Sequence, residues 1–162
     1  MNFSDIPEQV IRKIQYKDEI LNAWWNGVLH PFNPSLWVTF NFNRPTTIEG
    51  AQRLIRRWHD FTDRKFIGHR YADLPMRRTA GAVVFEHLLT NLHGHGALRP
   101  AIHAGARSSE EVFDLYRNEW KKRVPSGELN IRHAVYETRS EMLNYMKKEC
   151  RRPGFFEDIL LL

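Results

Sequence analysis

Apolar and polar residues alternate with a period of two in residues 36–43 (LWVTFNFN) and again in residues 127–137 (GELNIRHAVYE). This alternation is typical of β-strands that bury one face and expose the other. Between them, residues 80–88 (AGAVVFEHL) and 92–99 (LHGHGALR) favour two further strands joined by a short turn. The sequence therefore predicts four strands, of which the middle two form a hairpin.

Helical patterns fill the intervals between these strands. Residues 44–66 place apolar residues at helical spacing, and Thr46 or Thr47 is a candidate N-cap. Residues 108–124 open with serines and acidic residues and close with basic ones, which suits the helix dipole. A last helix is expected over residues 138–152, because a Pro-Gly pair follows it.

The predicted order is strand, helix, strand, strand, helix, strand and a final helix. It indicates an α+β fold of the split βαβ kind, a ferredoxin-like or RRM-like sandwich, in which helices pack on one face of an antiparallel sheet. The other face of the sheet is left open. Several nucleic-acid-binding domains of this shape bind their ligand on that open face.

The length of 162 residues suits one main domain. Prolines and asparagines in the stretch LHPFNPS (29–35) separate it from an N-terminal helical pattern over residues 5–28. We therefore expect a helical extension over residues 1–34, the main domain over residues 35–152, and a C-terminal tail over residues 153–162.

Composition narrows the class of protein. Cys150 is the only cysteine, which excludes an internal disulfide framework and a zinc site made of cysteines alone. No apolar run approaches the ~20 residues that span a membrane, and the N-terminal residues lack the apolar core of a signal peptide. We expect a cytoplasmic protein in a reducing compartment.

Positive charge indicates a polyanionic partner. The chain has 24 Lys and Arg residues against 19 Asp and Glu residues, and its formal net charge is +5. Nucleic acid is the first candidate, and a solvated basic surface without a partner is the alternative. The basic residues considered as candidate phosphate contacts are Arg77, Arg78, Lys121, Lys122 and Arg123.

Two histidines and an acidic residue lie close together in the predicted hairpin. A turn centred on residues 90–91 would pair Glu86 with His95. Side chains alternate between the two faces of a strand, so Glu86, His93 and His95 are expected on the same face. Two imidazoles and a carboxylate leave open positions for water or phosphate oxygen, which favours Mg²⁺ or Mn²⁺, although zinc would also bind. The alternative is a solvated strand face that carries these residues by chance.

The remaining histidines are weaker candidates. His87 is adjacent to Glu86, but the strand alternation places it on the opposite face of the sheet. Four others are interpreted as surface or internally satisfied histidines, namely His59, His69, His103 and His133.

Tyr145 and Lys148 are three residues apart in the last predicted helix and so share one of its faces. A tyrosine hydroxyl can attack phosphorus when a metal polarises the phosphate, and a nearby lysine lowers the phenol pKa and binds the phosphate oxygens. The same pair is also ordinary in a helix that packs through its tyrosine and exposes its lysine. The pair alone therefore does not decide the function.

Three features follow one another along the chain: WVTFNF (37–42), EHLLTNLHGH (86–95) and YMKK (145–148). In this order they resemble the three motifs of HUH endonucleases. More narrowly, they resemble the Rep branch, the single-tyrosine initiators of rolling-circle replication. The resemblance covers roughly residues 35–150 and implies the same sandwich fold.

The resemblance also implies a role for each candidate residue. Glu86, His93 and His95 would hold one divalent cation, Mg²⁺ or Mn²⁺. Tyr145 would attack the scissile phosphate of single-stranded DNA and leave a 5′-phosphotyrosine link with a free 3′-hydroxyl, while Lys148 would orient or neutralise that phosphate. The link would keep the energy of the broken bond, so both nicking and ligation are expected.

The chain departs from the family pattern at Gly94, which stands between the histidines where the family has a bulky apolar residue. Gly94 and Gly96 predict a less rigid strand, although the ligands themselves are intact. No helicase-like segment follows the motifs, so a stand-alone nuclease domain is expected.

Trp37, Thr39 and Asn41 are expected on the open face of the first strand, where they are candidate contacts to DNA. Stacking of a base on an aromatic ring contributes roughly 1–3 kcal/mol. Burial of Trp37 under the N-terminal helix is the alternative for this residue and is slightly favoured.

Other functions stay open at this point. The replication initiator is expected to act on single-stranded DNA at an origin hairpin or nick site, as a monomer or weak dimer. A small single-tyrosine HUH transposase would share the motifs and form a firm dimer. A non-catalytic nucleic-acid-binding module would bind without a metal or a covalent adduct. A structural or interaction domain would leave the candidate ligands splayed apart.

Overall fold

The computed structural model describes residues 33–86, 91–101, 107–134, 141, 145–146 and 159–162. The chain divides into two compact units, Met1–Pro31 and Phe32–Leu162, and all of the described residues belong to the second unit. The helix expected over residues 5–28 lies outside the described residues, as do Lys148 and most of the last predicted helix.

A five-stranded antiparallel sheet forms the centre of the second unit, in the order β4-β1-β3-β2-β5. Its strands are β1 (Leu36–Asn41), β2 (Ala80–Glu86), β3 (His93–Arg99), β4 (Glu128–His133) and β5 (Leu160–Leu161). Helix α3 (Ile48–Ile67) follows β1, and helix α4 (Ser109–Arg123) follows β3. Since β3 lies between β1 and β2, the predicted split βαβ, ferredoxin-like fold is confirmed.

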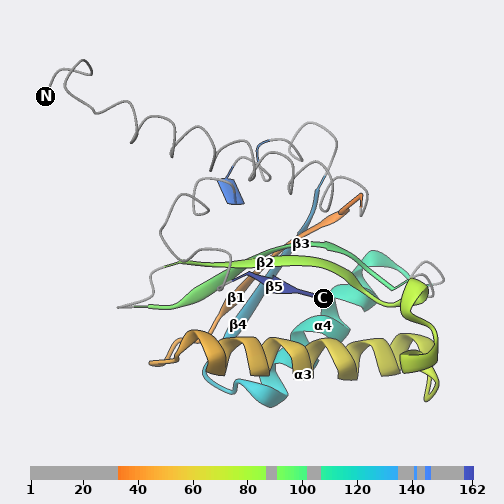
Figure 1. Ribbon diagram of the computed structural model, residues 1–162, viewed down its shortest axis with the longest axis horizontal. Coiled ribbons are helices and arrows are strands. Elements are labelled where there is room, and N and C mark those ends of the chain that lie inside the picture. Colours follow the sequence, from red (N-terminus) through yellow and green to blue (C-terminus); the bar gives the residue numbers. More distant parts are fainter. Residues whose placement is uncertain (1–32, 87–90, 102–106, 135–140, 142–144, 147–158) are drawn as a thin grey trace, which may run out of the picture. The chain divides into compact units, whose positions relative to one another are not determined.

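Both helices pack on one face of the sheet, as predicted (Figure 1). Val38 and Phe40 of β1 point toward them and are fully buried. Phe40 meets Trp58 of α3 and Trp120 of α4 edge-on, with ring centres 5.0 and 5.1 Å apart. Such edge-on aromatic pairs add stability beyond the area that they bury. The main hydrophobic core therefore lies between the sheet and these two helices.

Local hydrogen bonds define where both helices begin. The Thr47 hydroxyl accepts a hydrogen bond from the Gly50 N–H at 3.1 Å, so Thr47 is the N-cap of α3. Helix α4 begins with a capping box, in which Ser108 and Glu111 each accept from the other's backbone N–H. Gly68 ends α3 with a φ of 97°, a left-handed conformation that favours glycine.

The second face of the sheet is covered at its centre and open at one side. Ala82, Val84 and Ala97 are fully buried on this face. By contrast, Asn130 and Arg132 of the edge strand β4 are exposed. Solvent therefore reaches this face along β4. The open part of the face is narrower than the sequence predicts, because the centre of the face is buried.

The short strand β5 differs from the sequence-based prediction of a C-terminal tail. Its residues Leu160 and Leu161 pair with β2. The Gly81 N–H donates to the Leu162 carbonyl at 3.3 Å, and the Leu162 N–H donates to the Gly81 carbonyl at 3.0 Å. A strand of two residues is too short to produce an alternation that a sequence pattern could reveal.

The segment between α3 and β2 is a loop with two short 3₁₀ turns, η3 (Tyr71–Asp73) and η4 (Pro75–Arg77). Residues of this loop are mostly exposed. Within the described parts of the chain, no helix has both the length and the apolar character needed to cross a lipid bilayer.

A buried network fastens the end of this loop to α3. Asp63 accepts hydrogen bonds from Arg78 Nε at 2.9 Å and from the Thr79 N–H at 3.0 Å. His59 Nε2 lies 2.7 Å from the Thr79 carbonyl oxygen and therefore carries a proton, while its Nδ1 accepts from Arg78 at 3.0 Å. His59 is thus internally satisfied, as expected. Burial alone would raise the pKa of Asp63, but the bonds from His59, Arg78 and Thr79 lower that pKa below its ordinary value.

Candidate metal centre

The hairpin of β2 and β3 brings the candidate ligands together, although its register differs from the predicted one. Glu86 pairs with His93, and Val84 pairs with His95, so the predicted pairing of Glu86 with His95 is wrong. The connection between the strands is centred one residue earlier than the predicted turn, which shifts the pairing by two residues. An even shift keeps every side chain on its original face, so Glu86, His93 and His95 still project together.

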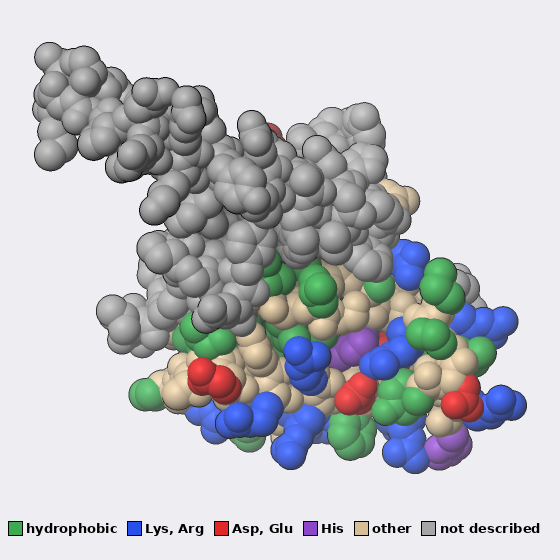
Figure 2. Space-filling view, viewed as in Figure 1, with side chains coloured by type: hydrophobic (Ala, Val, Ile, Leu, Met, Phe, Trp, Pro, Cys, Tyr) green, Lys and Arg blue, Asp and Glu red, His purple; other side chains and the backbone are tan. Residues whose placement is uncertain are grey.

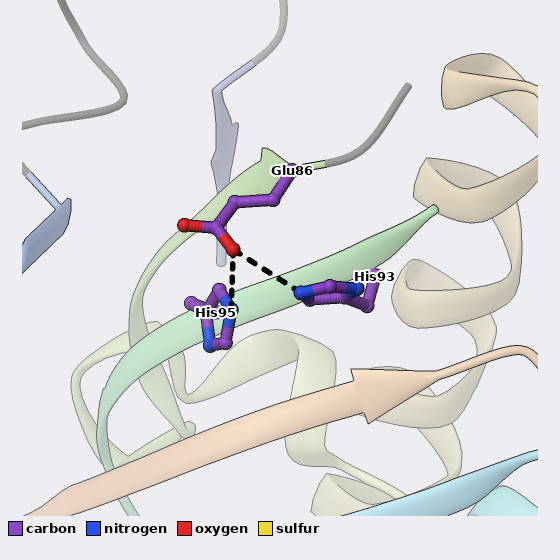
Figure 3. A group of neighbouring side chains, drawn as sticks. All are labelled: Glu86, His93 and His95. Atoms are coloured by element: carbon purple, nitrogen blue, oxygen red, sulfur yellow. Dashed lines mark hydrogen bonds and ion pairs between the residues drawn. The ribbon is translucent and has the colours of Figure 1, made fainter. Parts of the chain in front are cut away.

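One carboxylate oxygen is the meeting point of the three side chains (Figure 3). Glu86 Oε2 lies 3.1 Å from His93 Nε2 and 3.2 Å from His95 Nε2. One ligand atom from each residue lies within 4.8 Å of the others. Glu86 and His95 are buried, and His93 is half-buried. This group could hold a metal ion.

Both imidazoles are oriented through their second ring nitrogen. His93 Nδ1 lies 3.0 Å from the Asn91 carbonyl oxygen, which can only accept, so this nitrogen carries a proton. His95 Nδ1 lies 3.2 Å from the Thr39 hydroxyl, which can donate or accept. Both Nε2 atoms are thereby directed at Glu86. In metal-binding histidines, the ring nitrogen that does not bind the metal generally makes a hydrogen bond that orients the ring.

The electrostatics of Glu86 favour its charged form. Burial alone would raise the pKa of this carboxyl group, because burial disfavours the charged form. The hydrogen bond from Tyr145, the positive charge that His95 can carry and the contacts with the His95 and His93 rings lower the pKa of Glu86 below its ordinary value. Glu86 is therefore ionised at neutral pH, as a cation ligand must be.

Tyr145 joins this centre from a distant part of the chain. Its hydroxyl donates a hydrogen bond to Glu86 Oε2 at 2.9 Å. Its ring lies edge-on to the rings of His95 and Trp37, with centres 5.2 and 5.9 Å apart. Tyr145 is 41% exposed, so a ligand can approach the phenol from solvent. The role of its neighbour Lys148, which lies outside the described residues, stays a prediction.

The first strand supports the centre from beside it. The Trp37 ring stacks on His95 at 5.4 Å with an angle of 23° between the planes, and Trp37 is only 7% exposed. Trp37 is therefore buried. Its predicted cover, the N-terminal helix, lies outside the described residues and stays a prediction. Thr39 and Asn41 are half-buried on the same face of β1. A direct contact of these three residues with DNA stays a prediction.

The candidate basic residues do not gather at this centre. Arg78 is held by two aspartates of α3, with N–O distances of 2.8 and 2.9 Å. Lys122 and Arg123 both pair with one glutamate of α4, at 2.7 and 2.8 Å. Arg77 and Lys121 are exposed. The ion pairs of Arg78, Lys122 and Arg123 place those three side chains with the helices, on the opposite side of the sheet from the candidate ligands.

The support that Thr39 gives to the His95 imidazole was not predicted from the sequence. Thr39 faces His95 because the two residues pair across β1 and β3. That pairing joins residues that are distant in sequence, and no local pattern specifies its register. The alternation of β1 did indicate that Thr39 shares a face with the histidines, and this was the available signal.

Comparisons of the chain with protein-family models, with curated proteins and with solved structures gave no match. The chemistry of the centre is therefore the basis for a function. An ionised carboxylate and two oriented imidazoles can bind a cation, and the adjacent phenol can present a nucleophile to an anion held by that cation.

Proposed function

We propose that the protein is a metal-dependent endonuclease and strand transferase that nicks single-stranded DNA through a covalent 5′-phosphotyrosine intermediate, as HUH initiators of rolling-circle replication do. The observation that carries this proposal is the 2.9 Å hydrogen bond from the Tyr145 hydroxyl to Glu86. The reaction requires a nucleophile and a cation at one phosphate. A phenol in direct contact with a candidate metal ligand supports that requirement.

The donor set fits a divalent cation. Glu86, His93 and His95 would hold it, with one oxygen and two nitrogen ligands. When bound, the cation would polarise the phosphate and neutralise the charge that develops on its oxygens. Three protein ligands leave room for water and phosphate oxygen, which supports Mg²⁺ or Mn²⁺ as the working ion.

Tyr145 would supply the nucleophile. Its phenol oxygen would form a bond to phosphorus, and the bond from phosphorus to the 3′-oxygen of the preceding nucleotide would break. The phenol passes its proton to solvent water, and the departing 3′-oxygen takes one from water to become a free hydroxyl, so no net proton is gained or lost. Glu86 accepts the hydrogen bond of the phenol and so orients the attacking oxygen. Attack by a DNA 3′-hydroxyl on the adduct reverses these steps and rejoins the strand.

A search for the covalent adduct tests the proposal. The protein is mixed with Mn²⁺ and a pool of single-stranded oligonucleotides, and the products are separated under denaturing conditions. We expect a protein band that carries DNA. Tyr145→Phe removes the nucleophile and should abolish this band while DNA binding survives. Tyr71→Phe removes a phenol hydroxyl from the loop turn η3 and should leave the band unchanged.

The remaining outcomes separate the competing functions. Nicking by Tyr145→Phe would refute the assigned nucleophile. Metal-dependent nicking by a variant with both His93→Ala and His95→Ala would refute the assigned ligands. DNA binding without any adduct, and indifferent to Mn²⁺ and Mg²⁺, would indicate a non-catalytic module. A firm homodimer in solution would favour the transposase over the replication initiator.

A further inference from the structure

The outer surface of α3 and α4 carries two hollows that share the side chain of Arg57. The first, of about 410 Å³, lies at the start of α3, and the second, of about 470 Å³, lies between α3 and α4. The basic residues that line them are Arg44, Arg53, Arg57, Lys65, Lys122 and Arg123. We call this surface the basic groove. Figure 2 shows Lys and Arg side chains gathered over α3.

The basic groove has a strong excess of positive charge. Within the described part of the chain, Glu119 is the one acidic residue that lines it. The Glu119 carboxylate pairs with Lys122 Nζ at 2.7 Å and with Arg123 Nη1 at 2.8 Å, so its charge is already compensated. The four other basic residues of the groove are exposed, namely Arg44, Arg53, Arg57 and Lys65. These charges suit a polyanion.

The spacing of the charges suits an extended polyanion. Arg53, Arg57 and Lys65 lie along one side of α3, with Phe61 between the last two, at intervals of one helical turn. At a rise of 1.5 Å per residue, the row from Arg53 to Lys65 spans about 18 Å. Each of the three cations in this row can contact one phosphate of a polyanion that runs along it.

The groove offers little to unpaired bases. Among the residues that the structure describes, Phe61 is the one aromatic residue that lines it, and the Arg123 guanidinium carbon lies 4.1 Å from the centre of the Phe61 ring. Surfaces that hold single strands combine positive charge with several aromatic platforms for stacking. Duplex DNA is held through its phosphates, with no need for aromatic stacking. The composition of the groove therefore favours a duplex.

We infer that the basic groove binds the phosphate backbone of double-stranded DNA. The groove lies on the helical side of the sheet, whereas the candidate metal centre projects from the other side. The biological setting of this inference rests on the proposed function: the single strand to be nicked would occupy the sheet face, and the adjoining duplex would lie along α3 and α4. Binding itself needs neither a cation nor Tyr145.

Fluorescence anisotropy with a labelled, blunt duplex of about 25 base pairs tests this inference, in EDTA and over a range of salt concentrations. The groove variant combines Arg57→Gln with Lys65→Gln. The control variant combines Arg70→Gln with Arg117→Gln, which removes the same charge from exposed positions elsewhere. Because all four positions are exposed, thermal unfolding should be unchanged in both variants.

We expect the groove variant to bind the duplex about tenfold more weakly at a fixed salt concentration near 0.1 M, and the control variant to stay within about twofold of the original protein. The logarithm of the association constant falls linearly with the logarithm of the salt concentration. The slope of this line should become less steep by about 1.8, because two phosphate contacts are lost. Equal losses in both variants would overturn the inference. A larger loss for a single strand of the same length than for the duplex would overturn the assignment to duplex DNA. Since no cleavage is involved, failure of the proposed nicking activity would leave these results unaffected.

Discussion

At the scale of single residues, Thr39 holds the candidate centre in its geometry through a contact of 3.2 Å with His95 Nδ1. Valine has a similar shape but no hydroxyl, so Thr39→Val removes this contact. We expect about tenfold weaker Mn²⁺ binding, measured by titration calorimetry. Thr39→Ser keeps a hydroxyl and should keep the affinity, while Thr46→Val removes a hydroxyl far from the centre. Unchanged binding by Thr39→Val would show that this hydroxyl does not position the imidazole.

The glycine between the two histidines is explained by packing on the helical face. A Cβ atom at Gly94 would lie 2.9 Å from Val83 Cγ1 and 3.3 Å from Phe85 Cε1. The neighbouring strand therefore fills the space that a bulky residue would take, and the ligands on the opposite face keep their positions.

Gly94→Ala should accordingly destabilise the fold, because the added methyl group overpacks this part of the core. We expect the free energy of unfolding in urea to fall by about 1–3 kcal/mol. Val83→Ala in the same chain should recover part of the loss, since it removes the closest neighbour. Gly96→Ala, whose Cβ would lie no nearer than 3.3 Å to any neighbour, is the matched control and should cost less. Equal losses at both glycines would contradict this account.

At the scale of elements, the buried carboxylate of Asp63 joins α3 to the loop that precedes β2. Because its pKa is lowered in the folded protein, Asp63 stabilises the fold above its ordinary pKa of 3.8. This stabilisation is lost as the pH falls through the lower pKa of the folded state.

Asp63→Asn should therefore lower the free energy of unfolding at pH 7, by about 3 kcal/mol, because it leaves Arg78 without this charged partner. The difference from the original protein should narrow as the pH falls below 3.8, measured by urea unfolding at a series of pH values. The exposed pair of Asp73 and Arg70 provides the control, and Asp73→Asn should change stability by less than about 1 kcal/mol at every pH. A constant gap for Asp63→Asn would refute the role of its ionisation.

The elements of the main unit were largely predictable from the sequence because their signals are local. Alternation marks β1 and β4, capping residues mark α4, and the parity of side chains along a strand placed Glu86, His93 and His95 on one face. A register error of two residues leaves every side chain on the same face of the sheet. The three candidate ligands were therefore predicted correctly, although the predicted pairing of β2 with β3 was wrong. The strand β5 and the contact of Thr39 with His95 depend on pairing between distant segments, and no local pattern encodes such pairing.

At the scale of the whole molecule, a cation that binds only the folded state should raise the melting temperature. At a concentration of 100 times its dissociation constant, Mn²⁺ would stabilise the fold by about 2.7 kcal/mol. Glu86→Gln removes the anionic ligand, and we expect it to abolish most of the thermal shift. Glu110→Gln, an exposed change on α4, should keep the shift. A full shift in Glu86→Gln would place the ion elsewhere.

The pairing of β5 with β2 has a practical consequence for handling the protein. All seven residues of β2 are buried, and two of them pair with Leu160 and Leu161. Trimming those leucines would bare the hydrogen-bonding groups of an apolar strand, which is a template for intermolecular aggregation. Any expressed version of the protein should therefore retain Leu160 and Leu161.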